Sequence, residues 1–315
     1  MLTRRHIRVK VMQSLYALSQ SKTVNLEKEE KFLLTSMDNT YNLYLTLLNL
    51  LIEIHELAAS RLDASQKKYL ATAEDKNPNR KFINNEVLTM LVNNELLKTE
   101  IEDRKLNNWY LDEEYVKILL DEIENSELYK DYMKEKLSSF KEDKEFIVDI
   151  YKEIIAPNEK LYDYIEDYKL TWIDDLPAVN TMFLKFLRKL KNNNYPEEHF
   201  LPKLFKDEDD KKFGVDLLKK TMLNDEMLQE HINGKTPNWD TDRIADLDNV
   251  LLKMAICEFL KFPSIPIKVS INEYLEIAKE YSTPKSSIFI NGILDKIVKD
   301  FEKTEKLNKV GRGLL

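Results

Sequence analysis

The sequence contains few glycines, prolines, histidines and cysteines. Its 315 residues include 5 glycines, 9 prolines, 4 histidines and 1 cysteine. Sandwiches, barrels and phosphate-cradling loops need glycine at their turns, so the scarcity of glycine argues against them. Cys257 cannot form an internal disulfide, and its apolar neighbourhood favours a packed thiol over a nucleophile. The composition predicts a mostly helical protein and is consistent with a reducing, cytoplasmic setting.

Motifs for nucleotide and metal binding are incomplete. The Gly-Lys-Thr sequence at 234–236 resembles the end of a P-loop, but the first glycine of that motif would fall on Gln229. The His-Glu pair at 55–56 begins a zinc-protease motif, but Ala59 stands where the second histidine is required. Scattered histidines and one cysteine do not make a thiolate metal site. We therefore expect no metal, no cofactor and no enzymatic activity.

The sequence also predicts no membrane-spanning segment. The most apolar run, residues 43–57, is interrupted by Asn49, Glu53 and the His-Glu pair, and it is too short to span a bilayer. Near the start, Lys10 and Gln13 interrupt any signal-peptide core. We expect a buried helix in the apolar run and no membrane partner.

The first twenty residues are basic, although the whole chain has a net charge of −8. They contain Arg4, Arg5, Arg8 and Lys10 and no acidic residue. Cations in a first helical turn oppose the helix macrodipole, and places where a sequence breaks a local rule are often functional. The spacing lets the three guanidinium groups share one region. We interpret them as clustered, unpaired arginines that hold phosphate.

Helical periodicity extends through the middle of the chain. Thr3 is a plausible cap for a first helix that runs to about Ser19, and residues 27–62 form one or two long apolar helices. Residues 112–175 hold twenty acidic residues against nine lysines. We interpret this segment as a helical module with a solvated acidic face. The alternative is a docking surface for a basic partner or a guard against stray nucleic acid.

Three helices are predicted in the last third. Asp240 caps the first, which runs to about Lys261. Ser270 and Glu273 have the spacing of a capping box that opens the second. Pro284 takes the first position of the third.

Ordered motifs at the two ends of the chain resemble the NusB family of transcription antitermination factors. The opening Arg-Arg-x-x-Arg at 4–8 and Gln-Ser-Leu-Tyr at 13–16 resemble the family's first helix. The sequence Ile-Pro-Ile-Lys-Val-Ser-Ile-Asn-Glu at 265–273 is similar to its Val-Pro-x-x-Val-x-Ile-Asn-Glu run. Phe-Ile-Asn-Gly-Ile-Leu at 289–294 resembles Phe-Val-Asn-Gly-Val-Leu. Further matches lie at 238–244, 255–260 and 277–279.

This resemblance implies an all-α fold, a NusB-like helical bundle of two packed helical subdomains with a large helical insertion after the first helix. The first helix of the RNA-binding domain would be residues 1–24, and the rest of that domain would be residues 203–302. Residues 25–202 would be a helical, partly acidic insertion that includes the family's second helix in part, as in the long form of the family. Residues 303–315 would be a basic, flexible tail.

The resemblance also implies a function. Family members pair with the ribosomal protein NusE, bind boxA-type RNA and act with the RNA polymerase antitermination complex, chiefly on ribosomal RNA operons. The positions carried over as RNA-binding are Arg4, Arg5, Arg8, Lys285, Ser286 and Phe289. Phe289 would stack on an unpaired base, with core packing as its alternative role. The positions carried over as partner-binding are Tyr16, Asp242 and Asp248, each with local bonding or solvation as the alternative.

Two other functions remain open at this point. The chain is alternatively a helical protein-docking scaffold with little RNA binding, in which residues 112–175 recruit a partner. It is alternatively a NusB-like module related to ribosomal RNA cytosine methyltransferases. Those enzymes need a methyl-donor-binding α/β domain with a catalytic cysteine, whereas Cys257 lies within the helical motifs.

Overall fold

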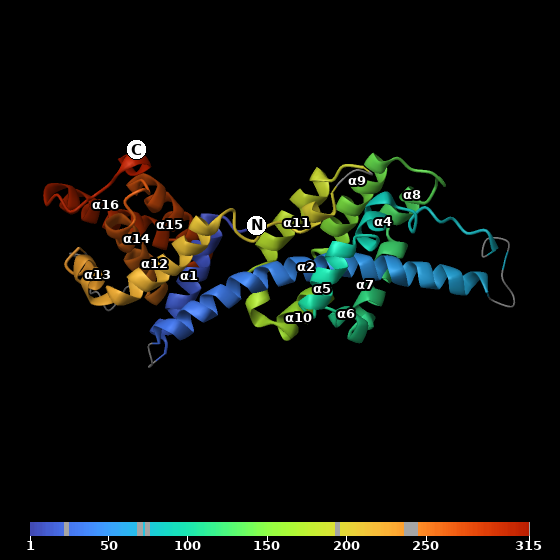
Figure 1. Ribbon diagram of the computed structural model, residues 1–315, viewed down its shortest axis with the longest axis horizontal. Helices are drawn as coiled ribbons and strands as arrows, with labels where there is room; N and C mark the ends of the chain where they lie inside the picture. Colours follow the sequence, from blue (N-terminus) through green and yellow to red (C-terminus); the bar gives the residue numbers. More distant parts are fainter. Residues whose placement is uncertain (22–24, 68–71, 73–75, 193–195, 236–244, 315) are drawn as a thin grey trace. The chain divides into compact units, whose positions relative to one another are not determined.

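The computed structural model describes residues 1–21, 25–67, 72, 76–192, 196–235 and 245–314 (Figure 1). The regular elements in these ranges are all helical, which confirms the all-α fold class. The chain divides into two compact units. Unit 1 consists of residues 1–37 and 204–315, and unit 2 consists of residues 38–203.

Unit 1 brings the start of the chain together with its last third. Its helices are α1 (Arg4–Ser19), the first part of α2 (Leu26–Gln66), α12 (Glu208–Leu223), α13 (Asp225–Ile232), α14 (Asp246–Lys261), α15 (Ile267–Tyr281), α16 (Ser286–Lys303) and the short 3-10 helix η5 (Gly311–Leu314). Helix α14 packs against α1, α12, α13, α15 and α16, so it is the central helix of the unit. Its side chains from Leu251 to Phe259, except Lys253, are buried.

Helix α1 completes this core although it is distant in sequence from α12 and α14. Its apolar stripe, Ile7, Val11 and Leu15, is buried in the same cluster as Leu251 of α14. Gly214 of α12 lies so close that an added Cβ would stand 2.8 Å from the Ile7 side chain. The close approach of α1 and α12 therefore depends on that glycine.

Unit 2 contains the remaining helices. They are the rest of α2, α4 (Glu86–Val92), α5 (Glu95–Asp103), α6 (Asn108–Leu111), α7 (Glu113–Asn125), α8 (Glu127–Tyr132), α9 (Phe140–Ile150), the π-helix η1 (Tyr151–Ile155), α10 (Glu159–Tyr168), the 3-10 helix η2 (Leu170–Trp172), α11 (Leu176–Lys189) and the 3-10 helix η3 (Glu197–Phe200). Trp109 donates its indole N–H to the Thr46 carbonyl and anchors α6 on α2.

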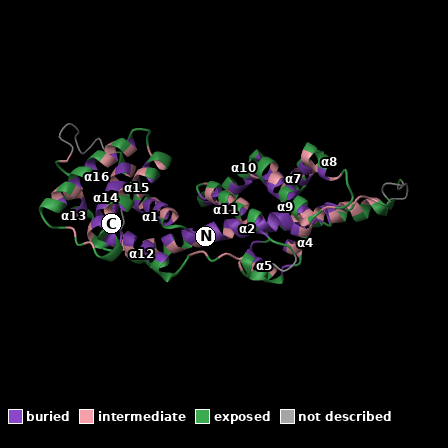
Figure 2. Ribbon diagram, turned by 90° about the horizontal axis from the view of Figure 1, so that it is seen from above, coloured by how far each residue is buried: buried purple, intermediate pink, exposed green. Residues whose placement is uncertain are grey.

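Helix α2 is long and apolar enough to cross a membrane by length and composition alone. Its most apolar window is 67% buried inside the structure, however. Figure 2 shows the buried middle of this helix. Packing against other helices accounts for its apolar side chains, so α2 is a core helix, as expected for residues 43–57.

The acidic segment is helical, but its charge is not all on a solvated face. Asp143 is 1% exposed. Its carboxylate accepts hydrogen bonds from the Tyr132 hydroxyl at 2.5 Å, from Ser138, and from the Glu86 backbone N–H at 2.8 Å. Asp143 therefore organises the junction of α4, α8 and α9 inside unit 2.

Two expected helix starts differ from the structure. Helix α15 begins at Ile267 with Pro266 as its N-cap, so Ser270 and Glu273 lie inside the helix and the predicted capping box is wrong. Pro at this position ends the preceding loop and its fixed φ is compatible with a helix start. Helix α16 begins at Ser286, two residues after Pro284. The predicted cap Asp240 lies outside the described residues.

Candidate nucleic-acid interface

The start of α1 is fixed by a capping box. The Thr3 side chain accepts from the His6 backbone N–H, and the His6 ring nitrogen Nδ1 accepts from the Thr3 backbone N–H at 3.2 Å. This reciprocal pair satisfies two donors that a helix N-terminus leaves open. It sets the first two turns of α1, which carry Arg4, Arg5 and Arg8.

Each of the three arginines makes an ion pair with a carboxylate from a distant part of the chain. Arg4 Nε donates to Asp210 Oδ1 of α12 at 2.8 Å. Arg5 donates from Nε and from a terminal nitrogen to the two oxygens of Glu273, at 3.0 and 2.9 Å. The interpretation of these residues as an unpaired cluster is therefore wrong: the acidic partners lie in α12, α14 and α15, which local sequence spacing does not bring into view.

Arg8 differs from the other two because it is buried. Its side chain is 2% exposed, and it donates two hydrogen bonds to Glu258 of α14, at 2.9 and 2.7 Å. Glu258 is 0% exposed and also accepts from the Ser270 and Tyr274 hydroxyls, at 2.5 and 3.0 Å. Arg8 is thus part of the core of unit 1, and the expectation that it contacts RNA phosphate directly does not fit this burial.

The electrostatics of the two bidentate pairs agree with this division. Burial alone would lower the pKa of the Arg8 guanidinium, but the charge and hydrogen bonds of Glu258 outweigh it and raise the pKa. At the surface, the hydrogen bond from Arg5 holds the pKa of the Glu273 carboxyl below its usual value. Glu258 thus stabilises the charged form of Arg8 inside the core, and Glu273 pairs with charged Arg5 at the edge of the core.

A groove of about 720 Å³ lies over this arginine cluster. The charged and titratable residues that line it are Arg4, Arg5, His6, Arg8, Glu273 and Arg312 of η5. Of these, Arg8 reaches it only at the 2% of its side chain that is exposed. Pro266 and Val269, from the N-cap and first turn of α15, provide apolar surface. We call this feature the arginine groove. The side chains of Arg4 and Arg5 are 44% and 41% exposed, so they present charge to it.

Arg312 belongs to the segment for which the sequence predicts a flexible tail. Lys309 Nζ donates to the backbone carbonyls of Glu258 and Phe262, at 3.3 and 3.0 Å. The Val310 N–H donates to the Pro263 carbonyl at 3.1 Å. These bonds join the segment to the C-terminal end of α14. Sequence analysis missed Arg312, and no local signal other than its positive charge points to it.

The other expected RNA-binding positions lie at the start of α16. Lys285 is its exposed N-cap residue. Ser286 is 2% exposed and donates to Asp248, so its hydroxyl is used inside the unit. Phe289 is half-buried against the core, whereas its neighbour Ile288 is 76% exposed. Among the described residues that line the arginine groove, none comes from α16.

The expected partner-binding positions differ in how exposed they are. Tyr16 on α1 is 40% exposed. Asp248 is 5% exposed and accepts from the hydroxyls of Ser282 and Ser286, at 2.6 and 2.8 Å. Asp248 therefore ties α14 to the turn before α16, and of the two positions that the structure describes, Tyr16 is the one with an exposed side chain. Asp242 lies outside the described residues.

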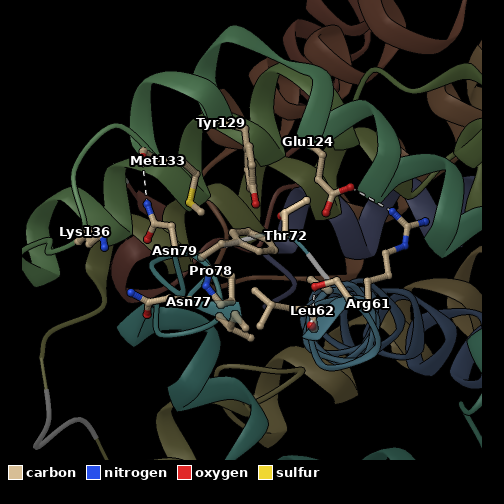
Figure 3. Close-up of a pocket in the computed structure, with 14 residues that line it drawn as sticks. Arg61, Leu62, Thr72, Asn77, Pro78, Asn79, Glu124, Tyr129, Met133 and Lys136 are labelled. Carbon is tan, nitrogen blue, oxygen red and sulfur yellow. Dashed lines mark hydrogen bonds and ion pairs between the residues drawn. The ribbon is translucent and has the colours of Figure 1, made fainter. Parts of the chain in front are cut away.

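A second cavity, of about 680 Å³, lies in unit 2 (Figure 3). Arg61 reaches toward Glu124 on its wall, and Asn79 donates to the Met133 carbonyl at 2.7 Å. Arg61 also pairs with Asp121 at 2.6 Å. Arg61 is thus matched by two carboxylates, and Lys136 is the other cation among the described residues that line this cavity. The arginine groove, with more arginines along its lining, is the stronger candidate for an anionic ligand.

Comparison with known proteins identifies what the chain is similar to. The model of the NusB family matches residues 178–299. The transcription antitermination protein NusB of Salinibacter ruber is 44% identical over 119 residues, which are 37% of this chain and 74% of that protein. The NusB proteins of Chloroherpeton thalassium and Methylacidiphilum infernorum are 42% and 45% identical, over 33% and 30% of this chain and 50% and 66% of their own lengths. No solved structure matches.

Proposed function

Because the chain belongs to the NusB family, we propose that it is a non-catalytic, RNA-binding transcription antitermination factor. In this proposal it binds boxA-type RNA together with the ribosomal protein NusE, joins the RNA polymerase antitermination complex and supports transcription of ribosomal RNA operons. It acts in the cytoplasm and needs no cofactor. The names of the matching relatives support the general role.

The arginine groove is the observation that carries the RNA-binding part of the proposal. It places the partly exposed guanidinium groups of Arg4 and Arg5 beside the apolar surface of Pro266 and Val269. Guanidinium groups bind phosphate, and an apolar floor accommodates the face of an unstacked base. A cationic groove on a chain of net charge −8 is a local feature rather than a consequence of composition.

Within this proposal the named residues have different roles. Arg4 and Arg5 contact the RNA backbone, and Arg8 holds α1 against α14 and α15 from inside the core. Lys285 adds a cation at the start of α16, where Phe289 contributes mainly to packing. Tyr16 contacts the protein partner. Asp248 affects that surface only indirectly, by holding the N-terminal turn of α14 in place.

A binding assay with two single-stranded RNAs tests the proposal. Candidate boxA-type RNA and a scrambled RNA of the same composition are titrated with the full chain, with and without NusE. We expect tighter binding of the boxA-type RNA, and a further gain when NusE is present. Equal binding of both RNAs under both conditions, or no binding to either, would contradict it.

Unit 2 supports a second candidate function, protein docking. Tyr110 and Leu111 of α6, directly before the acidic segment 112–175, are 82% and 83% exposed. Exposed large apolar side chains that lie together mark interaction sites. The test replaces both with serine and measures retention of RNA polymerase in a reconstituted antitermination complex. Unchanged retention would remove this surface from the candidates.

A further inference from the structure

The arginine groove contains one cation whose charge is not used within the described structure. Arg4, Arg5 and Arg8 each pair with a carboxylate, whereas Arg312 makes no ion pair with any described residue. It is exposed and lines the same groove. An unneutralised guanidinium has more to gain from a phosphate than one that must first give up a carboxylate.

The position of Arg312 is built rather than accidental. Lys309 and Val310 attach the preceding residues to the end of α14 through three hydrogen bonds, as described above. Gly311 has a φ of +54°, which residues with a Cβ adopt at a cost. Gly313 is buried against the loop after α14, where an added Cβ would stand 1.9 Å from the Pro263 carbonyl oxygen. We call residues 309–313 the C-terminal clasp.

The arginine groove combines positive charge with apolar surface. Arg4 and Arg5 lie on α1, Arg312 lies on the clasp, and Val269, which is 45% exposed, lies on α15. Its volume of about 720 Å³ falls in the range of pockets that enclose a small molecule or a few groups of a larger ligand. The combination of cations with apolar surface suits a single-stranded backbone whose bases are unstacked.

We propose that Arg312, held by the C-terminal clasp, contacts a backbone phosphate of the same RNA strand that Arg4 and Arg5 bind. This inference rests on the proposed RNA-binding function and extends it to the end of the chain. The clasp thereby makes the C-terminal segment part of the RNA site, and Gly313 a residue on which RNA affinity depends without touching RNA.

Three variants of the full chain test the inference against salt-dependent RNA binding. Arg312→Gln removes one phosphate contact, so the log–log slope of affinity against salt falls by about 0.7 and affinity at 0.1 M salt falls about fivefold. Gly313→Ala keeps the arginine but displaces the clasp, and lowers affinity in the same way. Lys306→Gln is the matched control. It removes an equal charge from an exposed position that precedes the clasp and does not line the groove, and it leaves the slope unchanged.

The outcomes separate this inference from the function on which it rests. Equal effects of Arg312→Gln and Lys306→Gln, together with a clear loss for an Arg4→Gln, Arg5→Gln double variant, would overturn the role of Arg312 alone. Binding that is absent from the unaltered chain, with and without NusE, would overturn both. Hydrogen exchange of residues 309–313 must rise in Gly313→Ala, and an unchanged rate would show that the glycine does not hold the clasp.

Discussion

The buried pair of Arg8 and Glu258 gives the sharpest test of how unit 1 is assembled. Replacing Arg8 with Met leaves the Glu258 carboxylate without two of the four donors that it accepts from, at a site that is 0% exposed. Removing one partner of a buried ion pair costs about 3–5 kcal/mol, because the remaining charge stays buried. We expect a loss of stability of that size in unit 1.

Hydrogen exchange read by mass spectrometry is the suitable assay, because a chain with two compact units need not unfold in one step. A loss of about 3–5 kcal/mol lowers the protection of the slowest amides in α1 and α14 by about a hundredfold to a few thousandfold. Arg61→Met is the matched control in unit 2. The Arg61 side chain is 29% exposed and its partner Asp121 is 49% exposed, so the pair is partly solvated and the change costs about 1 kcal/mol or less.

A double variant isolates the pair itself. Glu258→Gln retains an oxygen that accepts from the Ser270 and Tyr274 hydroxyls, and in combination with Arg8→Met it removes both charges. The double variant should therefore lose less stability than the sum of the two single variants, by about 2 kcal/mol. A double variant whose loss of stability equals the sum of the two single losses would refute the reasoning. So would a loss of protection below tenfold for Arg8→Met.

Four further predictions concern three sites in unit 1. Glu273→Gln frees Arg5 and removes a negative charge from the arginine groove, so RNA affinity should rise; a fall would mean that the carboxylate helps binding. Because the folded-state pKa of Glu273 is lowered below 4.5, its contribution to stability is complete above that pH and is lost as the pH falls, so the glutamine variant should show a flatter acid limb in thermal melts. Asp248→Ala removes the buried carboxylate that accepts from two serine hydroxyls and should destabilise the unit by about 1–3 kcal/mol in urea titrations; no change is expected if the carboxylate served only a partner. Phe289→Ala should lower the melting temperature while Ile288→Ala leaves it unchanged, and the reverse order would place the ring of Phe289 outside the core.

Much of the fold follows from periodicity and capping in the sequence. Thr3 caps α1 as expected, and apolar side chains of the two predicted helices, α1 and α14, form the core of unit 1. These features depend on residues a few positions apart, which is the range that sequence patterns report. The NusB motifs added the link between the two ends of the chain, and α1 does pack against α12 and α14.

The differences at α15, at Arg8 and at Arg312 share one physical cause, which is that long-range partners change the role of a local pattern. Ser270 and Glu273 have capping-box spacing, but they lie inside α15, where one donates to Glu258 and the other accepts from Arg5. Arg8 belongs to the same basic motif as the exposed Arg4 and Arg5, yet its side chain is buried, where it pairs with the Glu258 carboxylate of α14. Arg312 enters the groove only because the clasp joins it to the end of α14.

The central claim is that exposed arginines at the groove hold RNA phosphates while Arg8 supports them from the core. The most direct measurement is the salt dependence of binding to boxA-type RNA for the unaltered chain and for an Arg4→Gln, Arg5→Gln double variant. Loss of two phosphate contacts should lower the log–log slope by about 1.4, with hydrogen exchange in α14 unchanged. An unchanged slope would contradict the claim and remove the arginine groove from the RNA site.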